Sequence, residues 1–342
     1  MPIRHDAPAL GVNVTTYRAA GRNDLLRDVL SRLDLDILGC REIPRLRPTL
    51  NPPYLIDAKE GRYFLKLKRP VASRAHAQLR AFLGNPGFSW ETTVLEALQR
   101  IEFDIFRFPR LVQTDGADYA LFEYVPRSSA QKLSGDYTQL FARALVEFQS
   151  AELRLDQQAR NRLWIACALT PSAKMLRRTL PRLFGRYGLA TAKRYAQIAR
   201  QCERSQGRIR KQWMLHNDLH HDNVFIGADG QLYFTDFENA APERKWLLTD
   251  IVNFAVGTSE PVIDFELIQR YLLELRCSPF SGYQLKISGQ LRFALMESTA
   301  QHVLRRAPLE SVRKAYEKLL FDVLLDDVSF EEWLDQEFGE SI

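Results

Sequence analysis

Residues His216 to Glu238 read HNDLHHDNVFIGADGQLYFTDFE, and most of what this sequence predicts follows from them. The pair Asp229-Gly230 lies between two apolar runs, which is a strong signal for a β-hairpin. A two-residue loop at 229 and 230 sets Asn223 opposite Asp236. The sequence therefore predicts that these two side chains are neighbours at the open end of a hairpin, with Asp218 on the loop leading into it.

The side chains of these three residues carry oxygens that suit phosphoryl transfer. The transition state of that reaction carries charge on phosphate oxygens, so catalysis consists mainly of positioning and electrostatic neutralisation. Magnesium prefers hard oxygen ligands, which the Asp236 carboxylate and the Asn223 amide supply. Asp218 is a separate carboxylate that can orient an acceptor hydroxyl and take its proton. Zinc is not expected at the nearby histidines, since neither cysteines nor a helical HExxH accompany them.

The same stretch resembles a known family. HxDxxxxN followed by Asp-Phe after a hairpin is similar to the catalytic and metal loops of the protein-kinase-like fold. The text from His216 to His220, with 236–238 and the later Asp250-Ile251-Val252-Asn253-Phe254, resembles the aminoglycoside phosphotransferase and choline/ethanolamine kinase branch. The resemblance covers about residues 43–260 and is most specific over 216–254.

The resemblance implies a role for each matched residue. Asp218 would be the catalytic base, and His216 a structural member of the catalytic loop. Asn223 and Asp236 would be magnesium ligands, with ATP and Mg²⁺ as cofactors.

A lysine on an apolar strand is the main prediction in the N-terminal part. Lys66 lies in Phe64-Leu65-Lys66-Leu67, where it costs desolvation unless it meets an anion. The family role is to hold the α- and β-phosphates while paired to a glutamate on the following helix. Glu91 is our choice for that partner and Glu96 the alternative. Lys68 shares the strand face with Lys66 and is a second candidate for the phosphate-binding lysine. Alternatively, Lys66 lies on an edge strand and points into solvent.

Two features next to that strand concern the nucleotide. Leu121 to Pro126 resembles the hinge whose backbone contacts adenine, so Glu123 and Val125 are predicted nucleotide contacts; the same residues are also typical of a core strand.

No GxGxxG precedes Lys66, and the proline-rich Arg47 to Pro53 takes its place. Prolines lack a backbone donor, so phosphate would be covered by the remaining amides, Arg45 or Arg47.

The order of elements predicts an α+β, protein-kinase-like bilobal fold with a small β-rich N-lobe and a larger helical C-lobe. Strand patterns run from 37 to 125 and enclose one helix near Ser89. Beyond Gly135 the pattern is mostly helical. We therefore expect a helical extension over 1–36, a nucleotide-binding N-lobe over 37–125, and a helical C-lobe over 126–342 with the catalytic loop and substrate site.

Composition limits the remaining possibilities. The 342 residues are 46% hydrophobic, but no run of about eighteen apolar residues exists, so no spanning helix is expected. Met1 to Leu10 does not form an apolar signal core, which favours a cytoplasmic protein. The four cysteines are widely separated without a CxxC pair, so we expect buried thiols rather than disulfides or zinc ligands.

The net charge of +5 is unevenly distributed. The segment 174–211 holds twelve Lys or Arg and one acid, whereas 321–342 holds eight acids and no base. These two segments can attract each other, or the basic helices can be a solvated face. They can also dock a phosphorylated glycan, a lipid head group or an anionic membrane. Nucleic acid is not expected, because aromatics interleave poorly and no binding module is recognisable.

The leading hypothesis is an ATP-dependent kinase that acts on a hydroxyl of a small molecule: a sugar, a glycan or an amino alcohol. An amino alcohol needs acidic and aromatic groups, and Trp246 and Phe254 are candidates for the aromatic ones. The missing glycine loop leaves a catalytically degenerate kinase-fold scaffold or binding protein as the alternative. A protein kinase is not expected, because Ala241-Pro242-Glu243 follows Asp236 too soon to enclose an activation loop and is predicted to form a turn.

Overall fold

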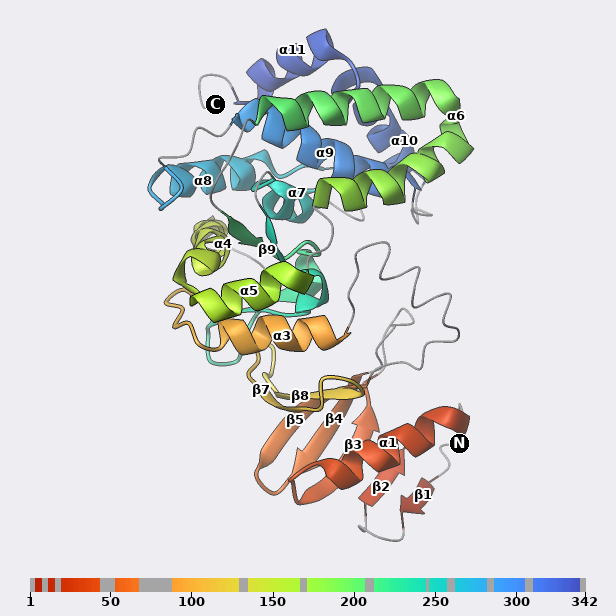
Figure 1. Cartoon of the computed structure of the whole chain (residues 1–342), viewed down its shortest axis with the longest axis vertical. Coiled ribbons are helices and arrows are strands. Elements are labelled where there is room, and N and C mark those ends of the chain that lie inside the picture. The colour runs from red at the N-terminus through yellow and green to blue at the C-terminus, as the bar shows by residue number, and fades with distance from the viewer. Residues whose placement is uncertain are drawn as a thin grey trace.

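The molecule has a small sheet-containing lobe and a larger, mostly helical lobe (Figure 1). This computed structural model describes residues 4–7, 12–15, 20–43, 53–67, 88–128, 135–166, 171–206, 212–243, 246–256, 262–281, 286–304 and 310–338. Five predictions lie outside the described residues: the phosphate-covering loop before Pro53, the roles of Arg45, Arg47 and Lys68, and the burial of Cys167. No helix in the described ranges is long and apolar enough to cross a membrane.

The N-lobe is built on a seven-stranded sheet in the order β1-β2-β3-β4-β5-β8-β7. Its strands are β1 (Arg4–Ala7), β2 (Val12–Thr15), β3 (Ile37–Glu42), β4 (Pro53–Ala58), β5 (Gly61–Leu67), β7 (Leu111–Thr114) and β8 (Tyr119–Glu123). Helix α1 (Ala20–Arg32) packs Leu26, Val29 and Leu30 against one face of the sheet. The segment 1–36, expected to be helical, thus also contributes two strands to this sheet.

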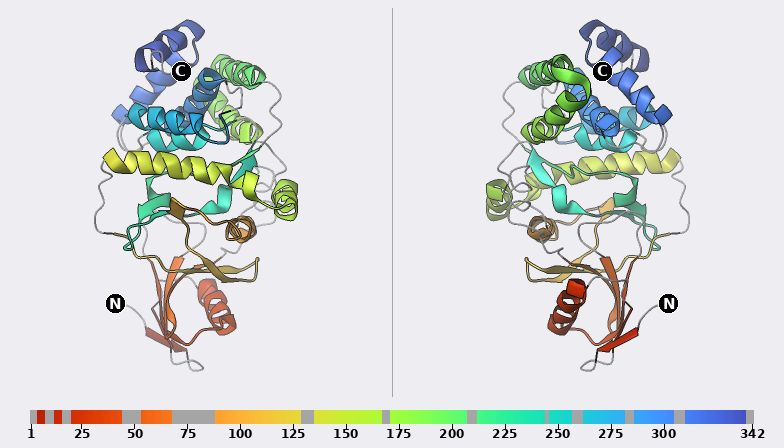
Figure 2. Two further views of the ribbon diagram at one scale, coloured as in Figure 1. Left: turned by 90° about the vertical axis from the view of Figure 1, so that its left-hand side faces the viewer. Right: turned by 90° about the vertical axis from the view of Figure 1, so that its right-hand side faces the viewer.

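The helix that carries Glu91 packs with the C-lobe rather than with α1. In α3 (Phe88–Leu98), Trp90, Val94 and Leu98 belong to the larger hydrophobic core, and the Trp90 indole Nε1 donates to the Ala240 carbonyl at 2.6 Å. Figures 1 and 2 show α3 lying between the sheet and the C-lobe helices. Position 91 is therefore fixed against the C-lobe, whereas Lys66 comes from the sheet of the N-lobe.

The C-lobe surrounds two small β elements with helices. Its helices are α4 (Gly135–Arg154), α5 (Gln157–Ala166), α6 (Pro171–Ser205), α7 (Thr249–Ala255), α8 (Phe265–Arg276), α9 (Ile287–Leu304), α10 (Glu310–Lys318), a π-helical segment (Leu319–Leu324) and α11 (Asp327–Phe338). One sheet joins β6 (Phe106–Arg107), β10 (Val224–Ile226) and β11 (Leu232–Phe234); the other joins β9 (Trp213–Leu215) and β12 (Ala241–Glu243). The Ala-Pro-Glu segment is thus a strand and not the predicted turn.

The hairpin of β10 and β11 differs from the prediction by one residue. Val224 pairs with Phe234, and the Thr235 N–H donates to the Asn223 carbonyl at 2.9 Å, so Thr235 lies opposite Asn223. The loop holds three residues, because Gly230 takes a left-handed conformation with φ 77° and its N–H donates to Gly227. A type I turn closed by a left-handed glycine is the common three-residue hairpin. Asp236 therefore follows the paired strand instead of ending it.

Three further expectations change with the structure. Cys40 and Cys202 are buried as expected, but Cys277 is exposed. The Trp246 ring stacks on Phe293 with 3.5 Å between the ring centroids, and the Phe254 ring stacks on Phe141 with 4.1 Å between the centroids. Trp246 and Phe254 are therefore buried core residues, and neither is available to line an amino-alcohol site.

The basic and acidic segments contact each other through one ion pair: Arg194 lies 3.3 Å from Asp327. A second cation of the basic helix, Arg186, lies 3.9 Å from Glu317, which is on α10 and precedes the acidic segment.

Candidate active site

A buried carboxylate holds the start of the catalytic loop. Asp250, at the beginning of α7, accepts the backbone N–H of His216 at 2.7 Å and that of Asn217 at 2.8 Å. These bonds fix the chain just before Asp218. From the sequence, Asp250 was only part of a motif that resembles the start of a helix in this family. Its burial and its contact with the loop before Asp218 became visible only in the folded structure.

We predict that replacing Asp250 with asparagine changes how stability depends on pH. Burial raises the pKa of Asp250 to about 7, against the two backbone donors that lower it. An acid with a raised folded pKa contributes most stability below its unfolded pKa, about 3.9, and loses that contribution as pH rises through 7. The advantage of the natural protein over Asp250→Asn should therefore shrink by about 3 kcal/mol between pH 5 and pH 8. Urea unfolding of both proteins measures it; a constant difference would refute the titration.

Two backbone conformations in the site are unusual. Among the described residues, Asn217 (φ 60°) and Asp236 (φ 67°) are the non-glycine residues with positive φ. Asn and Asp tolerate this region better than other side chains, and such strain persists only where contacts enforce it. The Asn217 amide Nδ2 donates to the Asn239 carbonyl at 3.0 Å, and Asp236 is held by Lys66. In each loop, a side-chain contact with a segment distant in sequence thus stabilises the residue with positive φ.

His216 joins the catalytic loop to the segment before Asp236. Its ring is fully buried, and Nε2 lies 2.9 Å from the Thr235 carbonyl. Burial lowers the pKa of His216, so the ring is neutral and Nε2–H donates to that carbonyl. The contact is structural, in line with the role that the family resemblance implies.

Lys66 connects both lobes through two carboxylates. Its Nζ lies 2.8 Å from Glu91 Oε1, 3.0 Å from Glu91 Oε2 and 2.8 Å from Asp236 Oδ1. Burial alone would lower the pKa of Lys66, but the Asp236 and Glu91 carboxylates raise it above its ordinary value. The ammonium therefore stays charged at neutral pH, where it can hold an anion.

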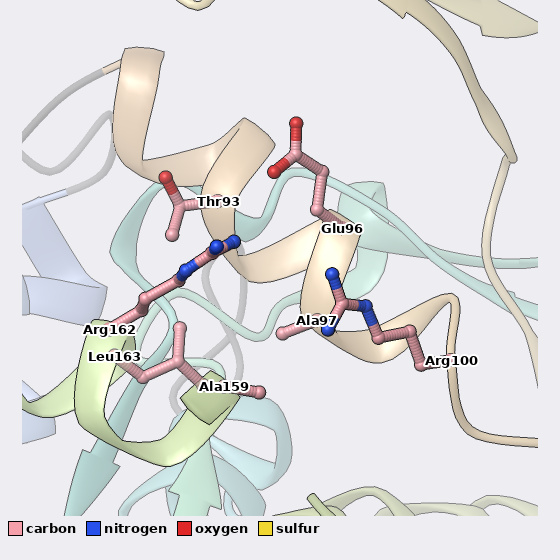
Figure 3. Close-up of a pocket in the computed structure, with 7 residues that line it drawn as sticks. All are labelled: Thr93, Glu96, Ala97, Arg100, Ala159, Arg162 and Leu163. Carbon is pink, nitrogen blue, oxygen red and sulfur yellow. The ribbon is translucent and has the colours of Figure 1, made fainter. Parts of the chain in front are cut away.

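The alternative partner Glu96 lies elsewhere on α3. It is exposed and lines a pocket between α3 and α5 together with Thr93, Arg100 and Arg162 (Figure 3). Because the Glu91 carboxylate lies against Lys66 and is only 2% exposed, the geometry selects Glu91 over Glu96 as the partner.

Asp218 and Asn223 lie on one short loop with their polar groups in contact. The Asn223 amide Nδ2 donates to the Asp218 carbonyl at 2.9 Å, and Nδ2 of Asn239 lies 3.5 Å from Asp218 Oδ2. Asn223 Nδ2 also lies 3.2 Å from His220 Nε2. Asn239 is a neighbour of Asp218 that sequence reasoning missed; its place one residue after Asp236-Phe237-Glu238 was the available signal.

The donor set at Asn223 and Asp236 fits a magnesium ion. Because the Asn223 amide nitrogen donates to the Asp218 backbone carbonyl, its oxygen is the atom left to act as an acceptor. Asp236 adds a carboxylate from the next loop. One carboxylate and one amide oxygen are the hard ligands that Mg²⁺ takes alongside phosphate oxygens.

The predicted hinge residues lie at the end of β8. Glu123 is the last residue of that strand; its N–H donates to the Arg110 carbonyl at 2.9 Å, and its exposed carboxylate faces Arg110 at 3.8 Å. Val125 lies two residues further on and is partly buried. Beyond it, Arg127 lies over the Phe225 ring at 4.7 Å and donates to the Asp222 carbonyl, which ties the hinge to the catalytic loop.

The sequence of these loops matches that of a known protein family. A model of the phosphotransferase enzyme family matches residues 44–268, which include all eight predicted site residues. The chain belongs to this family. A search of curated proteins finds no significant match.

Solved structures show the same fold. A spectinomycin phosphotransferase in complex with ADP and spectinomycin aligns with a TM-score of 0.54 and 13% identity, covering 92% of this chain and 98% of that one. A choline kinase from Cryptosporidium parvum aligns at 0.57 and 11%, covering 87% and 90%. A Plasmodium vivax ethanolamine kinase aligns at 0.52 and 12%, covering 91% and 86%. The predicted bilobal, protein-kinase-like fold and the prediction of a kinase-type phosphotransferase are thereby confirmed.

Proposed function

We propose that this phosphotransferase moves the γ-phosphate of Mg-ATP to a hydroxyl group of a small molecule. One observation carries the proposal: Lys66 of the N-lobe lies 2.8 Å from both Glu91 and Asp236, so a charged, buried ammonium is held next to the proposed metal ligand. A buried charge is costly unless it is paired, and Lys66 is paired with two carboxylates. A cation next to oxygen ligands for a metal is the arrangement that binds a phosphate group in kinases.

The N-lobe would hold the nucleotide. Lys66 binds phosphate oxygens while Glu91 keeps its ammonium in place, and the backbone of Glu123 and Val125 contacts the base. The spectinomycin phosphotransferase of the same fold was solved with ADP, which supports a nucleotide site here. Asn223 and Asp236 would hold magnesium, which when bound neutralises charge on the phosphate oxygens.

Asp218 would act on the acceptor. Its carboxylate accepts a hydrogen bond from the substrate hydroxyl and takes the proton as the hydroxyl oxygen bonds to the γ-phosphorus. The bond between that phosphorus and the β–γ bridging oxygen breaks, and ADP leaves with the electron pair. Asn239 beside Asp218 and the bonds from Asp250 to the loop keep the carboxylate in place.

The acceptor of the proposed reaction is a sugar, a glycan or an amino alcohol. The choline kinase and ethanolamine kinase of the same fold favour an amino alcohol, and the spectinomycin phosphotransferase favours a sugar-like compound. Because Trp246 and Phe254 are core residues, the two aromatic groups that the sequence offered for an amino alcohol do not support it, and we favour a sugar or glycan hydroxyl.

The test is ADP release from Mg-ATP across monosaccharides, aminoglycosides and amino alcohols. The proposal expects at least one hydroxyl compound to stimulate release, with a phosphate monoester as product by mass spectrometry. A thermal shift with Mg-ATP but no transfer to any compound would favour the kinase-fold scaffold. No shift and no turnover would contradict the nucleotide site.

A further inference from the structure

The long basic helix α6 forms a corner at the edge of the C-lobe. It bends at Gly188, whose φ of 83° and ψ of 177° are not helical. Figure 1 shows the two green arms meeting at the right-hand edge of the molecule, and the views in Figure 2 place them on the outside of the C-lobe. Between 171 and 202 the sequence holds eight Lys or Arg and no acid. The corner is thus both projecting and strongly positive.

Two large apolar side chains are exposed at this corner. Phe184 is 56% exposed and Leu189 is 54% exposed, on either side of the bend. The other large apolar side chains exposed in the described ranges lie on different elements, and Phe184 is the one aromatic among them. Single exposed apolar residues are ordinary, so this pair gains meaning from the positive charge of the same corner.

Cations line the outer face of the second arm. Lys193, Arg200 and Arg204 are exposed and follow Leu189 at helical spacing, so all four share one face. Unlike Arg186 and Arg194, these three have no acidic partner in the part of the chain that the structure describes. Their charge is therefore available to an external anion.

We propose that the bend of α6 docks on an anionic lipid bilayer. Phe184 and Leu189 enter the head-group layer, while Lys193, Arg200 and Arg204 contact lipid phosphates. Peripheral helices bind a membrane interface through apolar side chains that enter the head-group layer and through attraction of Lys and Arg to anionic lipids, and this corner presents both kinds of side chain. Juxtaposed basic residues add attraction to the negative surface potential of anionic lipids. A soluble polyanion would use the cations but would leave the two apolar side chains in water.

This surface is independent of the catalytic loop, so it is tested on its own. The full chain is sedimented with vesicles of phosphatidylcholine, with or without phosphatidylglycerol. We expect binding to the anionic vesicles only, and a weakening of about tenfold or more in Phe184→Ser/Leu189→Ser. The matched control is Leu273→Ser/Val328→Ser, which removes two apolar side chains of α8 and α11 that are at least as exposed as Leu189. Equal loss in both double variants would overturn the proposal.

A charge series completes the test. Lys193→Gln/Arg200→Gln should weaken binding to anionic vesicles by about tenfold, whereas Arg27→Gln/Arg143→Gln, on exposed positions of α1 and α4, should not. Thermal unfolding confirms that each variant is folded. Absence of vesicle binding, equal binding to neutral vesicles, or binding to a soluble phosphorylated polysaccharide with none to vesicles would each overturn the membrane assignment.

Discussion

Asp218→Ala is expected to lower the turnover number by about a thousandfold while the protein still binds Mg-nucleotide. Asp218 is partly exposed on the catalytic loop, and Asn239 Nδ2 lies 3.5 Å from its carboxylate. In the proposed mechanism this carboxylate contacts the acceptor hydroxyl and not the nucleotide, so its loss removes proton transfer and orientation but leaves nucleotide binding intact. Turnover is measured as ADP release with the best acceptor from the screen, and binding as the thermal shift caused by Mg-ADP.

The same loop supplies the control for this variant. Asp222 lies four residues further on, and its side chain is 92% exposed. Asp222→Ala should keep turnover close to that of the natural protein. Transfer that persists in Asp218→Ala, or an equal loss in both variants, would remove Asp218 from the role of base.

Lys66→Met is expected to have the second-largest effect, on both stability and nucleotide use. The variant leaves Glu91 and Asp236 without the cation that lies between them. Removing one partner of a buried ion pair typically costs about 3–5 kcal/mol, because the remaining charge is uncompensated. We also expect kcat/KM for ATP to fall by about a hundredfold or more, since the phosphate contact is lost. Urea unfolding and steady-state kinetics measure the two effects.

Two glutamates of α3 distinguish this account from a general effect of charge. Glu91→Gln should lower kcat/KM for ATP, because it weakens the contact that positions Lys66. Glu96→Gln, on the exposed side of the same helix, should change neither kinetics nor stability. If the two glutamine variants behave alike, Glu91 does not position Lys66.

Local sequence was sufficient to place the predicted site residues on a hairpin, on the loop before it and on an apolar strand, but not to predict how the chain brings these segments together. The Asp-Gly pair located the hairpin, yet Gly230 closes a three-residue loop, which moves the register by one residue. Turn type depends on the φ that a glycine adopts, and two loop lengths were compatible with the same letters. Lys66 was identified because a lysine on an apolar strand needs an anion.

Contacts between distant segments were beyond the reach of the sequence pattern. Glu91 and Glu96 both lie on α3, and their choice depends on which face of that helix turns toward the sheet. The helix packs with the C-lobe core through Trp90 and its bond to Ala240, a contact that joins residues 150 positions apart. The clamp by Asp250 is also long-range: a helix start is visible in the sequence, but the buried side-chain position facing His216 is not.

In the proposed mechanism, Asn223 and Asp236 share a divalent ion with the nucleotide. The most direct measurement is the affinity for ADP by isothermal titration calorimetry, with and without Mg²⁺, in the natural protein, Asn223→Ala and Asp236→Asn. We predict that Mg²⁺ tightens ADP binding by about tenfold or more in the natural protein and has little effect in either variant. The same gain from Mg²⁺ in all three proteins would contradict the account.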